Sequence, residues 1–367
     1  MGQGSIEALV PRGLLGSGMT FSEAQVTLEG LVAARIAWKE GRIIQIESIS
    51  LSQGRSLDLL LPRLVEPHAH IDKAFSWEEF PNLKGTYKGA LNTNLREYKE
   101  RTVEKVIIRA EKSLDIAMRN GLRAIRTHID SFGLNSEITW ERLIDLKKKW
   151  SDLIKLQFVG LVPLEYWDSG EGKLLASRIA SFGGLLGAVI VPPFKNKRTY
   201  YLIKNMLILA SKLGCGVDFH IDESIQSPGA GLKQLIRVLD EYQFKIPITC
   251  SHSSSMSLLP SRQLKVLADK LAKYKVNVIA LPLTNAWLLG RSENQTPYKR
   301  PLAPIIQLQK AGVNVSVGGD NVQDPWFPMG NFDPISLISF SMPLAQLSPW
   351  QRLGLSPFTS APSLMMG

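Results

Sequence analysis

The five histidines of the chain stand close to the ends of short apolar runs. They are His68, His70, His128, His220 and His252. His68 and His70 have one residue between them, a spacing that turns both imidazoles to the same side of a β-strand. Imidazole nitrogen is a ligand for zinc or iron, and an open position in such a site leaves room for water. The residue types and their spacing therefore indicate a metal centre that activates water.

Two residues that end other apolar runs complete a ligand set. We expect His68, His70, His220 and Asp320 to hold one divalent metal ion, because imidazole and carboxylate groups are common ligands of zinc and iron. The alternative is that these four polar side chains only hydrogen-bond one another.

Further polar residues near these ligands could move protons. Glu223 follows His220 by three residues, where it could take a proton from an activated water and deliver it to a substrate. A carboxylate in a surface loop is the alternative. His252 lies in a segment too polar for an ordinary core strand, and it could orient the attacking hydroxide or stabilise developing charge. His128 is interpreted either as a support for the ligands or as a direct participant.

Eight short apolar runs alternate with helix-patterned segments and would position these residues. The runs are Leu61–Ile71, Leu122–Ile129, Leu156–Pro163, Leu185–Val191, Cys215–Ile221, Pro247–His252, Val276–Leu283 and Val313–Asp320. Near-continuous apolar strands separated by helices are typical of a parallel sheet covered on both faces. Their span of about 260 residues favours a (β/α)₈ TIM barrel, which takes roughly 250, over an open doubly wound sheet. The carboxyl ends of barrel strands converge on one face, where the histidines would meet.

The segment before residue 61 has a different pattern. Short antiparallel strands are expected at Val26–Leu28, Ala33–Trp38 and Ile43–Ile49. We therefore expect a small, incomplete β-sandwich-like module at residues 1–60. The barrel would cover residues 61–345, and a weakly patterned C-terminal extension would cover residues 346–367.

Composition narrows the class of protein. The chain has 367 residues, 44% of them hydrophobic and 21% charged, as in ordinary soluble globular proteins. The net charge of +10 comes from dispersed Lys and Arg, so neither a nucleic-acid nor a membrane partner is indicated. No secretory signal is recognisable, and two cysteines, Cys215 and Cys250, fit a cytoplasmic protein. Their spacing does not match the cysteine pair of the small zinc deaminases.

Five polar segments, taken in their order along the chain, form a family signature. They are Leu64–Lys73, Arg126–Asp130, His220–Glu223, Ser251–Ser253 and Gly319–Trp326. This set resembles the cytosine deaminase branch of the amidohydrolase superfamily over about residues 60 to 330. The resemblance implies one iron or zinc ion held by His68, His70, His220 and Asp320. The bridging lysine of two-metal members is missing from the run 185–191, which agrees with a single ion.

The resemblance also implies a reaction. Asp320 would help to deprotonate the metal-bound water, Glu223 would carry the proton to a ring nitrogen, and His252 would assist the attacking hydroxide. Attack on an amino-bearing ring carbon would release ammonia. The implied protein is a hydrolase of carbon–nitrogen bonds in cyclic amidines, with a place in pyrimidine metabolism. We expect a small heterocycle as its substrate and a homo-oligomer as its assembly.

Three positions bear on the substrate. Leu164 stands where bacterial cytosine deaminases have a glutamine that reads the amide edge of the pyrimidine, and leucine cannot form those hydrogen bonds. Asn321 replaces an aspartate, and its amide both donates and accepts. Trp326 could stack on a flat ring or serve packing alone. We therefore expect these three residues to contact the substrate.

Three functions are compared. The first is hydrolytic deamination of a small amino-substituted heterocycle, with cytosine as the best-known example. The second is hydrolysis of an N-alkylamino-triazine or a cyclic amide, which a leucine at position 164 would favour. The third is a catalytically silent barrel that acts as a binding or scaffold protein, against which the intact set of polar residues argues. Family members normally return a C-terminal strand to the N-terminal module, and its absence predicts a truncated, less stable form.

Overall fold

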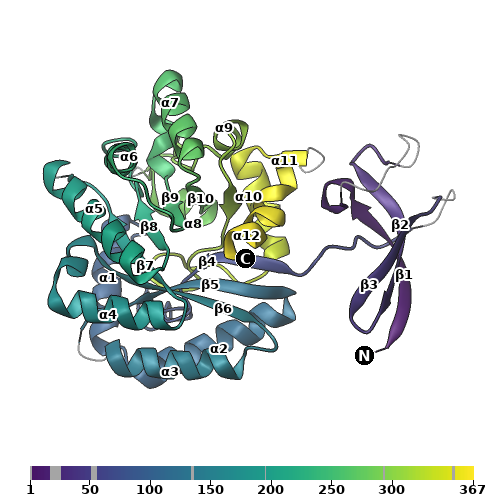
Figure 1. Ribbon diagram of the computed structural model, residues 1–367, viewed down its shortest axis with the longest axis horizontal. Helices are drawn as coiled ribbons and strands as arrows, with labels where there is room; N and C mark the ends of the chain where they lie inside the picture. The colour runs from purple at the N-terminus through teal and green to yellow at the C-terminus, as the bar shows by residue number, and fades with distance from the viewer. Residues whose placement is uncertain are drawn as a thin grey trace.

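The expected apolar runs form one eight-stranded parallel sheet that curves into a barrel (Figure 1). The computed structural model describes residues 2–16, 26–50, 56–133, 136–194, 196–291, 294–348 and 352–367. The barrel strands are β4 (Leu64–Ala69), β5 (Leu122–Asp130), β6 (Lys155–Pro163), β7 (Leu185–Ile190), β8 (Val217–Ile221), β9 (Ile248–His252), β10 (Asn277–Ala280) and β11 (Val315–Val317). Their order in the sheet is their order in the chain, so the predicted (β/α)₈ barrel is confirmed.

Helices cover the outside of the barrel. They are α1 (Tyr87–Glu100), α2 (Val103–Arg119), α3 (Ser136–Lys149), η3 (Leu164–Asp168), α4 (Gly170–Ser181), α5 (Asn196–Leu213), α6 (Ala230–Glu241), η4 (Ser254–Leu258), α7 (Ser261–Lys273), α8 (Pro282–Leu288), α9 (Ile305–Lys310) and α10 (Pro334–Ala345). In α2, Val106, Ala110, Leu114 and Ala117 are buried at helical spacing. Among the described residues, no helix is both long and apolar enough to cross a bilayer.

The barrel closes between β4 and β11 through a few polar contacts. The N–H of Asp320 donates to the carbonyl of His68 at 2.9 Å. The buried carboxyl group of Glu66 accepts hydrogen bonds from the N–H of His68 at 3.0 Å and from the N–H of Gly319 at 3.1 Å. A side chain at position 319 would have its Cβ only 3.0 Å from Glu66 Oε2, which explains the glycine. These contacts form a seam between β4 and the residues that follow β11, and the seam places His68 and Asp320 side by side.

The N-terminal module is a three-stranded antiparallel sheet beside the barrel (Figure 1). Its strands are β1 (Gln3–Pro11), β2 (Leu31–Lys39) and β3 (Arg42–Ser48), and η1 (Arg12–Leu14) follows β1. The expectation at Val26–Leu28 is wrong, because Val26 forms only an isolated bridge with Val32. β1 takes the place of that strand and was missed, although its polar Ser5 and Glu7 alternate with Ile6 and Ala8.

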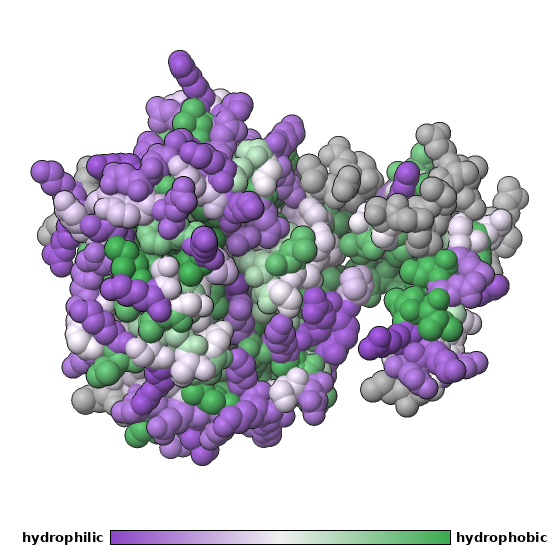
Figure 2. Space-filling view, viewed as in Figure 1, coloured by the Kyte–Doolittle hydropathy of each residue, from purple (hydrophilic) through white to green (hydrophobic). Residues whose placement is uncertain are grey.

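The module buries few side chains of its own. Val10, Ala34 and Ile36 form its small apolar cluster. Apolar side chains are also exposed on it (Figure 2), and Ile43 and Ile44 are 62% and 64% exposed. The described residues supply one sheet of the expected module, and the domain boundaries at residues 60 and 345 stay a prediction.

The C-terminal extension is helical. It contains α11 (Arg352–Leu355), η5 (Ser356–Phe358) and α12 (Ser360–Met366). Met366 packs against Val65 and Ala124 near the starts of β4 and β5. Lys155, the first residue of β6, donates to the carbonyl of Gly367 at 2.8 Å. The extension therefore covers the end of the barrel opposite the carboxyl ends of the strands, a role that its weak pattern did not predict.

Candidate active site

All five histidines meet at the carboxyl ends of the barrel strands. They come from β4 and the residue after it, from β5, from β8 and from β9, and each is at most 6% exposed. The ring centroids of His68 and His128 are 3.9 Å apart, and those of His68 and His220 are 4.7 Å apart. His252 lies 5.0 Å from His220. The structure thus brings together residues that are far apart in the sequence.

The four expected ligands place their atoms at metal-sharing distances. Nε2 of His70 lies 3.4 Å from Nε2 of His220 and 3.3 Å from Oδ1 of Asp320. Nε2 of His68 lies 3.5 Å from the same Oδ1 of Asp320. A tetrahedral ion with bonds of about 2.0–2.2 Å holds its ligand atoms about 3.3–3.6 Å apart. These atoms therefore fit one shared ion.

Distance alone does not separate the ligands from the other histidines. His68, His220 and His252 place one nitrogen each within 4.8 Å of one another, and so do His68, His70 and His128. Their other contacts differ. His128 Nε2 lies 3.5 Å from Asp218, and His252 Nδ1 lies 3.5 Å from Glu223. His128 and His252 therefore face carboxylates outside the expected ligand set.

Several buried atoms at this place lack a hydrogen-bond partner among the described residues. They include Nε2 of His68 and both carboxylate oxygens of Asp320. Burial lowers the pKa of His68, His70 and His220 well below the usual range, which keeps these imidazoles neutral and able to coordinate. Burial also raises the pKa of Asp320. An unpartnered buried polar group is costly, by about 1–3 kcal/mol, and a divalent cation would satisfy these groups together.

A chain of hydrogen bonds sets the orientation of His68. The hydroxyl of Ser251 donates to Asp218 Oδ1 at 2.7 Å, and Ser251 Oγ lies 2.9 Å from His68 Nδ1. Because the serine hydroxyl uses its only proton in the hydrogen bond to Asp218, its oxygen accepts a hydrogen bond from Nδ1–H of His68. The lone pair of Nε2 is then left for a metal. Burial opposes ionisation of Asp218, but His128 and Arg126 outweigh it and lower its pKa to about 2.

Sequence reasoning missed Asp218 and Ser251 as supports. The available signal was local, since Asp218 stands two residues before His220 and therefore on the same side of β8. For Ser251 the signal was its place directly before His252, within a segment already identified as too polar for a core strand.

Glu223 lies buried beside the histidines. The hydroxyl of Tyr87 donates to its Oε2 at 3.4 Å, and Oε1 lies 3.5 Å from Nδ1 of His252. Burial and the nearby charge of Asp320 raise the pKa of Glu223 well above the usual range. A carboxyl group with a raised pKa holds a proton more readily, which suits a group that takes a proton and passes it on. Tyr87 was not expected from the sequence.

His252 is neutral, and Asn285 lies at Nδ1, the ring nitrogen that also faces Glu223. Burial lowers its pKa to about 4, and Asn285 Nδ2 on α8 lies 3.0 Å from its Nδ1. Its backbone and that of Asp320 adopt left-handed conformations, with φ of +67° and +65°. Such conformations are uncommon outside glycine and often occur at functional sites.

The three expected substrate residues lie in different surroundings. Leu164 is 5% exposed and packs in the main apolar core at the start of η3. Asn321 is buried, and its Nδ2 donates to Asp324 at 2.7 Å. The ring of Trp326 meets that of Tyr87 edge-on, with centroids 5.1 Å apart. Contact of these residues with a substrate stays a prediction.

A buried ion-pair network adjoins the histidines and was also missed. Lys73 Nζ lies 3.0 Å from Asp130, and Arg101 Nη1 lies 3.0 Å from Asp72 and 3.1 Å from Asp130. Arg101 also donates to Glu97 of α1 at 2.9 Å. The network therefore ties α1 to the carboxyl ends of β4 and β5.

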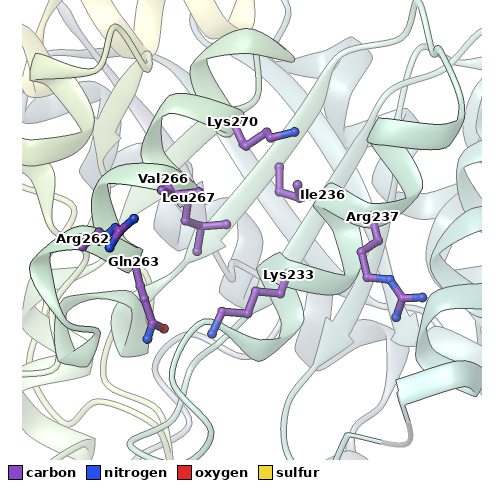
Figure 3. Close-up of a pocket in the computed structure, with 8 residues that line it drawn as sticks. All are labelled: Lys233, Ile236, Arg237, Arg262, Gln263, Val266, Leu267 and Lys270. Atoms are coloured by element: carbon purple, nitrogen blue, oxygen red, sulfur yellow. The ribbon is translucent and has the colours of Figure 1, made fainter.

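Two cavities lie in the surface around the barrel. One, of about 290 Å³, is lined by Asp320 and Glu66 at the seam and by apolar residues around α10. The other, of about 400 Å³, lies outside the barrel between α6 and α7 (Figure 3). Its lining includes Lys233, Arg237 and Arg262 but no candidate site residue. Of these two cavities, the smaller reaches one candidate metal ligand, Asp320.

Comparison with known proteins gives relatives along most of the chain, although no family model matches it. A pterin deaminase from Rhizobium rhizogenes (strain K84 / ATCC BAA-868) is 28% identical over 348 residues, covering 92% of this chain and 79% of the relative. An N-isopropylammelide isopropyl amidohydrolase from Pseudomonas sp. (strain ADP) is 23% identical over 303 residues, covering 81% and 72%.

Solved structures agree in fold. A 5-methylcytosine deaminase from Klebsiella pneumoniae superposes with a TM-score of 0.80 at 23% identity, covering 99% of this chain and 87% of that chain. An N-isopropylammelide isopropylaminohydrolase from Burkholderia multivorans ATCC 17616 gives 0.73 at 19% identity, covering 100% and 87%. At these identities the likeness confirms the architecture of the barrel.

Proposed function

We propose that this chain hydrolytically deaminates a small amino-substituted heterocycle. Its relatives confirm its resemblance to the cytosine deaminase-like branch of the amidohydrolase superfamily. The chain is a hydrolase of carbon–nitrogen bonds other than peptide bonds. The observation that carries the proposal is the placement of buried Glu223 and His252 beside four buried groups with metal-sharing distances.

In this proposal His68, His70, His220 and Asp320 hold one zinc or iron ion. Such an ion lowers the pKa of water and acts as a Lewis acid. The donor set supports it, because three neutral imidazoles and one carboxylate suit either metal. Support also comes from the unpartnered Asp320 oxygens, which a cation would satisfy.

The chain's own groups divide the remaining work. Glu223 would take a proton from the attacking water and deliver it to a ring nitrogen, for which its raised pKa suits it. His252, neutral and held by Asn285, would orient the nucleophile. The second oxygen of Asp320 would accept the other proton of that water, and this proton would pass to the departing amino group, which leaves as ammonia.

The relatives suggest which heterocycles to test. Pterin deaminase points to an amino-substituted bicyclic ring, and 5-methylcytosine deaminase points to a pyrimidine. Leu164, Asn321 and Trp326 are proposed to contact this ring. The second candidate is removal of an alkylamine from a triazine-like ring, favoured by the N-isopropylammelide relative and by the apolar Leu164.

The setting of the enzyme is likewise a proposal. The two free, buried cysteines, Cys215 and Cys250, support a cytoplasmic location. We expect a small heterocycle as the ligand, no nucleic-acid or membrane partner, and a homo-oligomer. A place in pyrimidine metabolism would follow only from turnover of a pyrimidine.

The test is ammonia release by protein whose metal content has been measured. The panel contains pterin, cytosine and 5-methylcytosine, with N-isopropylammelide assayed for isopropylamine. Ammonia released from any of the first three compounds supports the deaminase. The compound that reacts then identifies the kind of ring that the enzyme accepts. Isopropylamine alone would favour the second candidate. Silence on the whole panel at full metal occupancy would contradict both and favour the scaffold hypothesis.

A further inference from the structure

A small aromatic cluster covers the site on the side of Glu223. Tyr87 of α1, Trp287 of α8 and Trp326, which follows β11, pack around the buried residues Ala90, Leu288 and Leu289. These segments are far apart in the sequence. Their meeting places one aromatic hydroxyl, that of Tyr87, within reach of the proposed proton carrier.

The position of Tyr87 is set by the turn before α1. Thr86 caps the helix, its hydroxyl accepting from the N–H of Gly89 at 3.1 Å. Asn82 Nδ2 donates to the carbonyl of Thr86 at 3.1 Å. Gly85 has a φ of +58°, and a Cβ there would lie 2.7 Å from Arg291 Nη2, so this turn packs tightly against the segment after α8. The turn that carries Tyr87 is therefore held in place by hydrogen bonds and close packing.

The two oxygens of Glu223 have different neighbours. Oε2 accepts from the Tyr87 hydroxyl at 3.4 Å, while Oε1 lies 3.5 Å from Nδ1 of His252. Burial, followed by the charge of Glu223, raises the pKa of Tyr87 well above the usual range, so its phenol keeps the proton that it donates. Each oxygen of the carboxyl group therefore has one polar neighbour from another part of the chain.

We propose that Tyr87 is a positioning residue that orients the carboxyl group of Glu223 for proton transfer. The inference rests on the proposed role of Glu223 and extends it to a residue outside the barrel strands. Orientation matters because a proton moves efficiently only when donor and acceptor approach to about 2.6–3.2 Å. A carboxyl group free to turn would spend less time in the productive arrangement.

The first variant removes only the hydroxyl. Tyr87→Phe is expected to lower kcat by about ten- to a hundredfold, the scale of one hydrogen bond to a charged group, with KM within about twofold. Metal content should not change. The matched control is Tyr98→Phe on the same helix, whose ring stacks on Phe132 with centroids 4.6 Å apart, and its kcat should stay within about twofold. Unchanged kcat in Tyr87→Phe would overturn the inference, and so would a rise in KM alone, which means direct substrate contact.

A double-mutant cycle shows whether Tyr87 acts through Glu223. Once Glu223→Gln has removed the proton carrier, adding Tyr87→Phe should lower the residual kcat by less than about twofold. A further drop as large as in the wild-type background would mean that the two residues act independently, and would overturn the inference.

A structural readout separates this inference from the proposed function. In a crystal structure of metal-loaded Tyr87→Phe, the Glu223 carboxyl group is expected to turn away from its wild-type orientation. An unchanged orientation would overturn the positioning role, whether or not a substrate is known. If the wild-type protein turned over no compound of the panel, the proposed function would be contradicted. The structural comparison would then still test whether Tyr87 orients Glu223.

Discussion

Two buried polar clusters lie next to each other at the mouth of the barrel and differ in electrostatics. In the ion-pair network, Lys73 and Arg101 each meet carboxylates within about 3 Å. Burial opposes charge on Lys73 and Asp130, yet their partners outweigh it, raising the pKa of Lys73 and lowering that of Asp130. The charges of Lys73 and Arg101 therefore find their partners within the chain itself.

The histidine cluster is equally buried and lacks such compensation. Burial lowers the pKa of His68 and His70 and raises the pKa of Asp320, so each of these three groups is pushed toward its neutral form. The Asp320 oxygens have no hydrogen-bond partner among the described residues. Burial alone therefore does not mark a functional site. A buried polar cluster whose nitrogen and oxygen atoms are left without partners is a better marker, because a bound cation would satisfy those atoms together.

Removing a ligand should have the largest effect. His220→Ala is expected to lose bound metal and all measurable turnover together, because it removes one of the four proposed ligands of the ion. Metal content by elemental analysis and ammonia release check this. Gln263→Ala, in the outer cavity between α6 and α7, is the control and should keep both. Full metal occupancy in His220→Ala would contradict the ligand assignment.

Glu223→Gln should separate chemistry from metal binding. The amide cannot carry a proton, so kcat should fall by about 10²–10⁴-fold while metal content stays at the wild-type level. Turnover and elemental analysis on the same sample give the answer. Near-normal turnover would show that another group moves the proton.

Breaking the ion-pair network should affect folding instead. Arg101→Ala leaves the buried carboxylates of Asp72, Glu97 and Asp130 without a main partner, and should lower the free energy of unfolding by about 3–5 kcal/mol. Urea unfolding measures it. The control is Lys105→Ala, whose pair with Glu79 is exposed and should contribute less than about 1 kcal/mol. Equal losses of unfolding free energy in the two variants would mean that the buried network stabilises the fold no more than an exposed ion pair does.

The seam residue Glu66 should have the smallest effect. Glu66→Ala leaves the N–H groups of His68 and Gly319 without their acceptor, which should loosen two ligand-bearing segments and weaken metal binding by about tenfold. Competition with a chelator measures the metal Kd. Glu66→Gln, which keeps one acceptor oxygen, should recover part of the loss. Wild-type affinity in Glu66→Ala would show that the seam holds its shape without this carboxyl group.

Much of the fold could be predicted because its signals are local. The apolar runs that became β4 to β11 and the His68–His70 spacing depend only on neighbouring residues. Partners across the fold carry no such signal. Ser251 supports His68 from 183 positions away, and Tyr87 meets Glu223 across 136 positions. The strand β1 was missed although Ser5 and Glu7 alternate with Ile6 and Ala8, so a local signal for it was available in the sequence.

The sequence by itself therefore determined the barrel and the gathering of the histidines, because strand period and chain order are enough to send those residues to one end of the sheet. Only the tertiary structure decided how the seam closes through Glu66 and which buried charges find partners. Both depend on distances between segments far apart in the chain, and these distances exist only once the barrel has closed.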